Sequence, residues 1–403
     1  MRNMNTEGTE KKAGGHEERG KVMRKWLASR VLVTTFSVGT LMMAGARAQT
    51  GSQEAADPWK RVEVGTTASF RGLSAVTADV VWASGTHGTV IRTVDGGENW
   101  DVRVVAGAEN QDFRGIRAFD ADNAVIMSTG NAEKGLATIY RTSDGGKTWE
   151  LEFAPKTTGV FFDSIAFWDR KRGVVLSDPV GGRFVLFRTA DSGTTWTQVP
   201  PEKLPAALKG EGSFAASNSC IALQGEKNIW FVTGGASVAR VVRSNDGGET
   251  WDVAETPVRP ANASSGLFSV AFANATIGVA VGGDYQQSTG TPMPDAVGTE
   301  DGGKTWHELI APAERLFFSS VAFLPPLPVA DKPSISVTGA PWQEYRPNLL
   351  AAGPAGASSF HPGVVPGWIF DSGQNFNAMA VPTPQRAWAV GPKGFVARRD
   401  MSQ

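Results

Sequence analysis

The feature that most constrains this chain is a short motif that occurs five times, with the pattern Ser/Thr-x-Asp-x-Gly-x-Thr/Asn-Trp. Successive motif aspartates are 49, 47, 55 and 55 residues apart. A period of this length is typical of one four-stranded blade of a β-propeller. The motif aspartates are Asp95, Asp144, Asp191, Asp246 and Asp301. The motif tryptophans are Trp100, Trp149, Trp196, Trp251 and Trp306.

The motif, known as the Asp-box or BNR repeat, has the composition of a hairpin turn. Asp and Ser/Thr side chains accept hydrogen bonds from backbone N–H groups just downstream. Glycine supplies the positive φ that a tight turn between twisted strands requires. The Trp starts the next strand and can bury about 150–250 Å² against the neighbouring blade. We therefore interpret the box residues as structural, since five equivalent turns cannot all be one active site.

The number of blades follows from the strands that precede the boxes. Short apolar segments that end in Gly, Ser or Thr recur seven times, from residues 81–85 to residues 388–391. Most of them follow a segment with the pattern of an innermost strand, such as residues 70–73 and 113–116, and the fourth copy is looser, around residues 219–223. Alternating apolar residues with regular turn signals indicate antiparallel β-structure. The sequence therefore predicts an all-β fold, a seven-bladed β-propeller with Asp-box turns.

The ends of the repeat predict how the ring closes and where it is irregular. Residues 59–64 resemble the strand that follows each box, so we expect this N-terminal strand to complete the last blade, residues 376–399, and leave no open sheet edge. In the sixth blade we expect a second strand at residues 335–339, a long insertion at about 340–367 and a vestigial box at residues 371–376. A loop of that length is a functional lid or a solvated insertion with no role.

The N-terminal region has the pattern of an export signal. A basic segment is followed by an apolar run and by Ala46-Arg-Ala48, a small-x-small cleavage site. The apolar run is too short for a membrane span. We expect the mature protein in the periplasm or the extracellular space. The predicted organisation is an extension and signal peptide at residues 1–48, a linker at residues 49–58 and a single propeller at residues 59–400.

Composition argues against several classes of function. The whole chain has a net charge of −1, and the part after residue 48 has 30 Lys and Arg against 36 Asp and Glu. This acidic balance argues against nonspecific binding to nucleic acid. The chain has four histidines, one cysteine (Cys220) and no glycine-rich phosphate loop. We therefore expect no metal, no cofactor and no internal disulfide, and a monomer with no transmembrane segment in the mature chain.

A propeller usually binds its ligands around the central tunnel, on the face opposite the box turns. That face carries the loops between blades and the loops between the second and third strands. The inner strands place Arg71, Arg114, Asp163 and Asn377 near the tunnel mouth. The loops add His87, Asp178, Glu211, Ser213, Asn262, Ser265, Asp284, Tyr285 and Lys393.

The four carboxylates of this set allow two interpretations. As paired acids they could act as general acid and base in glycoside chemistry. Alternatively, they cap turns and accept hydrogen bonds from loop backbones. The catalytic candidates are Asp163, Glu211, Asp284 and Tyr285. The candidates for binding a ligand or partner are Arg71, Arg114, Asp178, Asn262, Ser265 and Lys393.

An arginine also precedes four of the boxes by one residue. These arginines form either a basic stripe for an acidic partner, or structural ion pairs and stems packed on the next blade. The four residues are Arg92, Arg141, Arg188 and Arg243.

The boxes, the pre-box arginines and the terminal segment Trp388-Ala-Val-Gly-Pro-Lys-Gly394 resemble bacterial BNR-repeat propellers, in particular the photosystem II stability/assembly factor-like family. The resemblance covers residues 59–399 and implies a non-enzymatic assembly factor that binds a membrane protein through an arginine-rich surface. Asp-box sialidases share the architecture, but this chain lacks their Arg-Ile-Pro element and an evident third arginine of their substrate triad. We expect an exported scaffold for a protein or cell-envelope partner. The alternative is a carbohydrate-active enzyme that acts on a glycan.

Overall fold

The computed structural model describes residues 57–290, 296–309, 315–325, 348–361 and 367–401. All of them belong to the second of the two compact units of the chain, Ala55–Gln403. The predicted signal peptide and most of the predicted linker lie outside the described residues. No helix in the described part is long and apolar enough to cross a membrane.

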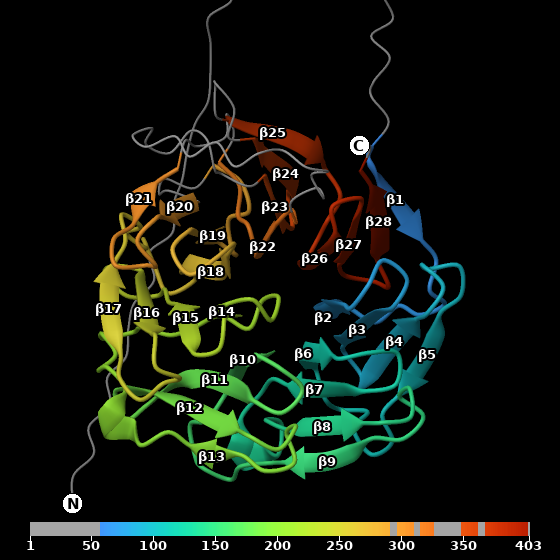
Figure 1. The fold of residues 1–403 in the computed structure, drawn as a ribbon, viewed down its shortest axis with the longest axis horizontal. Helices are drawn as coiled ribbons and strands as arrows, with labels where there is room; N and C mark the ends of the chain where they lie inside the picture. Colours follow the sequence, from blue (N-terminus) through green and yellow to red (C-terminus); the bar gives the residue numbers. More distant parts are fainter. Residues whose placement is uncertain (1–56, 291–295, 310–314, 326–347, 362–366, 402–403) are drawn as a thin grey trace, which may run out of the picture. The chain divides into compact units, whose positions relative to one another are not determined.

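Seven four-stranded antiparallel sheets form the blades of a propeller (Figure 1). Blade one consists of β2 (Phe70–Ala75), β3 (Val81–Gly85), β4 (Thr89–Thr93) and β5 (Asp101–Val104). Blade two consists of β6 (Phe113–Ala118), β7 (Ala124–Ser128), β8 (Ile139–Thr142) and β9 (Glu150–Phe153). Blade three consists of β10 (Phe162–Phe167), β11 (Gly173–Val180), β12 (Arg183–Thr189) and β13 (Thr197–Gln198). Blade four consists of β14 (Ile221–Gln224), β15 (Asn228–Val232), β16 (Arg240–Ser244) and β17 (Asp252–Glu255).

The remaining blades follow in chain order, and the predicted count of seven is confirmed. Blade five consists of β18 (Ser265–Phe272), β19 (Gly278–Asp284), β20 (Ala296–Thr299) and β21 (His307–Glu308). Blade six consists of β22 (Ser320–Phe323), β23 (Leu349–Gly353), β24 (Gly356–His361) and β25 (Gly367–Ser372). Blade seven consists of β26 (Ala378–Thr383), β27 (Arg386–Val390), β28 (Val396–Asp400) and β1 (Trp59–Val62). Two 3-10 turns are η1 (Ala132–Lys134) and η2 (Pro201–Lys203).

The two ends of the propeller close the ring. Strand β1 pairs with β28 in antiparallel register, from Trp59 opposite Arg399 to Val62 opposite Val396. The ring of Trp59 then packs on Phe376, with centroids 5.2 Å apart. The outer edge of the last blade is thereby paired with the start of the chain, as predicted.

The sequence prediction for the sixth blade was wrong. The segment expected to be an insertion, 340–367, contains β23 and β24, which pair from Leu349 opposite Phe360 to Gly353 opposite Gly356. The reason is that residues 349–353, Leu-Leu-Ala-Ala-Gly, fit the second-strand pattern as well as residues 335–339, which lie outside the described residues. Residues 367–372 form the outer strand, so residues 371–376 are not a box turn but the exit to blade seven.

The box turns have the hydrogen bonds that their composition predicts. In the first box, the Thr93 hydroxyl donates to the Asp95 carboxylate over 2.7 Å and accepts the Gly97 N–H over 3.0 Å. The Asn99 backbone N–H also donates to Asp95, at 3.0 Å. This N–H, together with the Asn99 and Thr93 side chains, lowers the pKa of Asp95 to about 2. The box carboxylates are therefore ionised and hydrogen-bonded within their own turns.

Tryptophans connect neighbouring blades. The indole of Trp82 in blade one donates to the Asp120 carbonyl of blade two over 3.1 Å. The rings of Trp82 and the box residue Trp149 meet edge to face, with centroids 6.3 Å apart. Trp388 of blade seven packs in the same way on Trp100 of blade one, at 5.8 Å. The aromatic contacts expected between blades thus also close the ring.

The pre-box arginines make structural contacts. Arg92 donates to the Ala121 carbonyl of the next blade over 2.6 Å, and Arg188 donates to the Gly247 carbonyl of the next box over 3.0 Å. The other two pair with carboxylates of their own outer strand, Arg141 with Glu152 and Arg243 with Asp252 (both at 2.7 Å). These bonds favour the structural interpretation of the arginines over the basic stripe.

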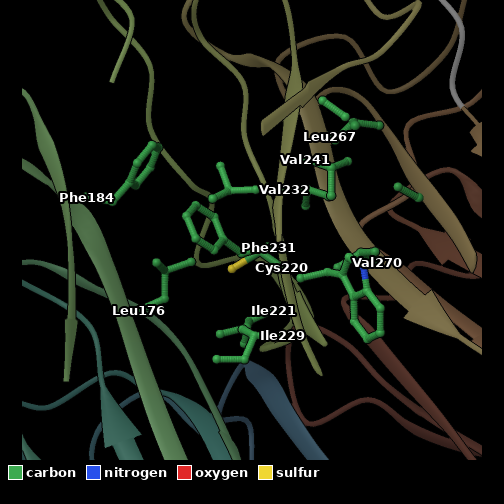
Figure 2. Close-up of a cluster of buried hydrophobic side chains, with 14 of the residues drawn as sticks. Leu176, Phe184, Cys220, Ile221, Ile229, Phe231, Val232, Val241, Leu267 and Val270 are labelled. Atoms are coloured by element: carbon green, nitrogen blue, oxygen red, sulfur yellow. The ribbon is translucent and has the colours of Figure 1, made fainter. Parts of the chain in front are cut away.

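The largest core cluster joins blades three, four and five (Figure 2). Figure 2 shows the Cys220 sulfur among apolar side chains that include Ile221 and Phe231. Cys220 is free and fully buried, and burial raises the pKa of its thiol. We therefore treat Cys220 as a core residue.

Two box glycines test how tightly the ring is closed. Gly97 and Gly247 both have positive φ, +90° and +82°, so alanine at either position adds about 1–2 kcal/mol of backbone strain. A Cβ on Gly97 would lie 2.5 Å from the Trp388 ring, whereas one on Gly247 would meet nothing within 4 Å. We expect Gly97→Ala to destabilise the protein by about 1–3 kcal/mol more than Gly247→Ala, measured by denaturant unfolding. Equal losses would show that the Trp388 contact is not tight.

Candidate functional site

A repeated β-bulge aims one residue of each regular inner strand into the ring. The register of β2 against β3 shifts between Phe70 and Gly72, and the strand pairs of blades two, three and five shift at the same place. The extra residue of a bulge leaves the ladder and is re-aimed. The four bulged residues are Arg71, Arg114, Asp163 and Phe268.

These bulged residues line one pocket of about 740 Å³, which we call the central pocket. Ser319 and Asn377, which hold the corresponding positions of blades six and seven, line it too. The inner strands start on the face opposite the box turns, so the central pocket lies on the face predicted from the repeat. Other predicted residues in its wall are Asp178, Glu211, Ser213 and Tyr285.

In blade four the bulge is replaced by a longer excursion of the chain. Gly212 pairs with Gly234, and the Val232 N–H donates to the Cys220 carbonyl, so the residues between leave the sheet. We call residues 214–219 the plug. Its loop, before β14, reaches toward the centre of the ring (Figure 1).

The plug is hydrogen-bonded to blades all around the ring. The Asn218 side chain accepts the Ile165 N–H over 2.8 Å, and Ser217 donates to the Ser319 carbonyl over 2.5 Å. Residues 214–216 line the central pocket, whereas Asn218 lines a smaller pocket of about 270 Å³ on the other side. The plug therefore forms the floor of the central pocket.

The two predicted arginines of the tunnel mouth hold the plug in place. Arg71 donates to the Ala216 carbonyl and Arg114 to the Ala215 carbonyl, both over 3.2 Å. Arg114 is also paired with Asp112 at 2.7 Å. Burial, and next the charge of Arg114, lower the pKa of Arg71. Both arginines thus have structural partners, while their side chains still border the central pocket.

Asp163 is the most unusual residue of the site. It is 1% exposed, and neither of its carboxyl oxygens has a hydrogen-bond partner among the described residues. Burial, and next the charge of Asp178, raise the pKa of Asp163 well above its ordinary value, and Arg114 only partly opposes them. The direction of this shift favours the neutral form of Asp163, the form that a general acid needs.

Asp178 is the second acid of this wall. Its Oδ1 accepts the Ser213 N–H over 3.1 Å, next to the plug. Burial raises the pKa of Asp178 to about 6, against the effect of that hydrogen bond. Because Phe162 pairs with Ser177, Asp163 and Asp178 follow paired positions of adjacent strands. We call these two residues the acid pair.

Glu211, a predicted catalytic candidate, is an anchor of its loop. Its carboxylate is bound by the guanidinium of Arg240 through both oxygens and accepts the Thr233 hydroxyl over 2.8 Å. It also accepts the Leu208 N–H over 2.7 Å. A carboxylate with all of these donors has no free position for proton transfer, so the geometry favours the turn-capping interpretation for Glu211.

Asp284 and its predicted neighbours form a hydrogen-bonded turn. Although burial opposes it, hydrogen bonds from Ser264 and Asn262, at 2.6 and 2.8 Å, lower the pKa of Asp284. Ser265 donates to the Asn262 carbonyl over 3.0 Å within the same turn. The turn positions Tyr285 at the rim of the central pocket. The Asp284 carboxylate remains ionised and is hydrogen-bonded within this turn, so the geometry again favours a structural role.

Aromatic residues line the same central pocket as the acid pair, and we call them the aromatic wall. Phe214 of the plug stacks on Phe268 with ring centroids 3.9 Å apart, and Phe317 meets Phe268 edge to face at 4.7 Å. Tyr285 completes the wall and is 53% exposed. The central pocket thus combines an apolar wall with a few polar groups, which is typical of ligand sites.

Five predicted residues do not line this pocket: Asn262, Ser265 and Asp284, which form the hydrogen-bonded turn described above, and Lys393 and His87. Lys393 is exposed, in the turn before β28, and has a positive φ of 56°. His87 is exposed in the turn before β4. Among the described residues no cluster of His, Cys, Asp and Glu could hold a metal ion.

Sequence reasoning missed the plug and the aromatic wall. The plug could have been suspected because the fourth blade has no compact inner-strand segment and carries small polar residues before Cys220. Phe268 holds the position after the first apolar residue of its inner strand, as Arg71 and Arg114 do, so the repeat alone marks it.

The fold and the pocket define the class of this protein: a seven-bladed β-propeller with a loop-lined pocket on a closed floor. No family model matches the chain, and a search of curated proteins gave no match. Among solved structures, YCF48 bound to a D1 peptide is similar with a TM-score of 0.59 and 18% identity, over 86% of this chain and 98% of that one. YCF48 from Cyanidioschyzon merolae is similar with a TM-score of 0.58 and 16% sequence identity, over 85% of this chain and 98% of that one.

A glycosidase shares the same architecture. The GH74 xyloglucanase from Xanthomonas campestris is similar with a TM-score of 0.53 and 16% identity, over 85% of this chain and 53% of that one. At these identities the similarities establish the fold. They confirm the predicted resemblance to assembly-factor propellers at that level.

The acid pair makes the stability of the protein depend on pH. A carboxyl whose folded pKa of about 6 lies above its unfolded value of about 4 stabilises the fold at low pH, and this contribution is lost as pH rises between those values. The box aspartates act in the opposite direction, below about pH 4. We expect Asp178→Asn, which keeps an acceptor for Ser213, to reduce the loss of unfolding free energy between pH 4 and 6 by about 1–3 kcal/mol. Identical pH slopes in denaturant unfolding would contradict this.

The anchor role of Glu211 predicts a strong and specific loss of stability. Glu211→Gln leaves Arg240 buried without its counter-charge, and we expect a loss of about 3–5 kcal/mol in unfolding free energy. The double variant Glu211→Gln/Arg240→Met should recover part of that loss, because no unpaired charge remains. A double variant that is no more stable than Glu211→Gln would argue against the ion pair as the cause.

Proposed function

We propose that this chain is an exported propeller that binds a segment of a protein partner in its central pocket. The observation that carries the proposal is the combination of the aromatic wall with polar groups aimed inward by rigid inner strands. A pocket of about 740 Å³ accommodates a few side chains of an extended segment. Preformed walls on strands reduce the entropy lost on binding.

The similarity to YCF48 supports a protein as the partner, because that propeller is described bound to a D1 peptide. Because the two sequences are only 18% identical, this support comes from the shared fold and not from matching residues. The acidic balance of the chain after residue 48 argues against nucleic acid as the partner.

A second function has one observation in its favour. Asp163 and Asp178 are two acids in a pocket with an aromatic wall, and the pKa of Asp163 is raised well above its ordinary value while that of Asp178 is about 6, a difference that suits a general acid paired with an ionisable carboxylate in a carbohydrate-active enzyme. The similarity to a xyloglucanase points to the same class. Binding is the better supported function because Glu211 and Asp284, the other candidate acids, are committed to their loops.

Selection from a peptide library on the purified full chain tests binding. We expect selected peptides to lose affinity at least about fivefold with Tyr285→Ala, because truncating an aromatic residue that packs on the ligand removes more than about 1 kcal/mol. The matched control is Phe370→Ala on β25, a similarly exposed aromatic (59%) outside the central pocket. Binding that Phe370→Ala weakens and Tyr285→Ala does not would place the partner elsewhere.

Incubation of the full chain with a panel of β-glucans and other glycans tests the alternative function, glycoside hydrolysis. We expect no hydrolysis by the full chain. Hydrolysis that Asp163→Asn abolishes, with the variant folded, would replace the binding proposal by a glycosidase.

The signal pattern before residue 49 supports export. Fractionation of cells that express the tagged full chain should recover a form shortened by about 48 residues outside the cytoplasm. A full-length cytoplasmic form would remove export from the proposal.

A further inference from the structure

The acid pair lacks the hydrogen-bond donors or counter-charge that buried carboxyls normally have. Two carboxyls share one wall of the central pocket, and the buried one, Asp163, has both oxygens without a hydrogen-bond donor among the described residues. A buried polar group is nearly always hydrogen-bonded, and an exception in a pocket indicates a missing ligand group. Asp178 has one hydrogen-bond donor among the residues that the structure describes, the Ser213 N–H.

The cations around the acid pair are already engaged. The charge of Arg114 reaches Asp163, but its guanidinium is paired with Asp112 and donates to the plug. Arg71 donates to the plug, too. Arg240 is bound to Glu211 through both oxygens.

We infer that the acid pair is a subsite for a cationic side chain, a lysine or arginine of the protein partner proposed above. The cation would place its charge between Asp163 and Asp178, where it provides the counter-charge that both carboxyls need in order to be ionised together. Its aliphatic stem would lie along Phe214 and Tyr285, which line the same pocket and contact each other edge to face. Long cationic side chains bury their stems on apolar surfaces in this way.

Proton release distinguishes a cation from a neutral ligand. In the free protein, burial and then the charge of Asp178 raise the pKa of Asp163 and so favour its neutral form. A cation favours the ionised pair, so binding should release protons and become weaker as pH falls. The Cys220 thiol faces Asp163 from blade four, and burial and then Asp163 raise its pKa, so it stays neutral throughout. The other charged side chains in the wall of the central pocket are Arg71, Arg114 and Glu211, and the ion-pair partners of the last two are Asp112 and Arg240.

The test uses n-butylammonium as the probe and n-butanol as a neutral probe of similar size, at constant salt. The side-chain carboxyl carbon of Asp163 is followed by NMR in the full chain from pH 4 to pH 9. We expect n-butylammonium to lower the titration midpoint of Asp163 by about one pH unit or more, and to bind about tenfold more tightly at pH 7.5 than at pH 5. No shift, or an equal shift with n-butanol, would overturn the inference.

Variants locate the cation. Asp163→Asn and Asp178→Asn should each weaken n-butylammonium binding at least about fivefold, and both retain the shape of the acid. Asp252→Asn, on the exposed outer strand β17, is the matched control and should leave binding unchanged. Binding that survives both acid variants would place the cation elsewhere and reject the subsite.

The inference rests on the proposed function, and peptides separate the two. In peptides selected on the full chain, replacing the cationic residue by norleucine or citrulline should weaken binding at least about tenfold. If peptides bind the central pocket and these replacements have no effect, the subsite is wrong and the binding function stands. If n-butylammonium binds the acid pair and no peptide is selected, the subsite stands and the protein partner is wrong.

Discussion

The pairing of β1 with β28 is the constraint on which the rest of this structure depends. It turns seven sheets into a closed ring, and a closed ring brings the starts of the inner strands together around one axis. The packing of Trp388 on Trp100 reinforces the same junction. Only because the ring is closed do bulges in blades one, two, three and five aim their residues at a common pocket.

Much of this could be predicted from the sequence, since the repeat is dense and its turn chemistry is local. The box hydrogen bonds, the seven blades and the placement of Arg71, Arg114 and Asp163 follow from short spacings. Blade six could not be predicted, because two apolar segments fit one strand pattern equally well. The plug depends on hydrogen bonds between residues far apart in the chain, such as Ser217 with Ser319, which no local pattern encodes.

The roles of the four carboxylates also required the structure. Glu211 and Asp284 are found with a full set of donors, whereas Asp163 has none among the described residues. The sequence alone does not distinguish these acids, because the groups that donate hydrogen bonds to them come from other parts of the chain. Burying Asp163 without a partner lowers the stability of the fold, and strain of this kind is usually retained where it serves a site.

The plug has a consequence for the symmetry of the molecule. A ring of seven similar blades offers a ligand seven nearly equivalent orientations. The plug enters from blade four alone, and the acid pair belongs to blade three alone. Together they break the rotational pseudo-symmetry, so the seven orientations of a ligand around the axis are no longer equivalent. The pocket is therefore asymmetric, although the blades that build it are repeats of one another.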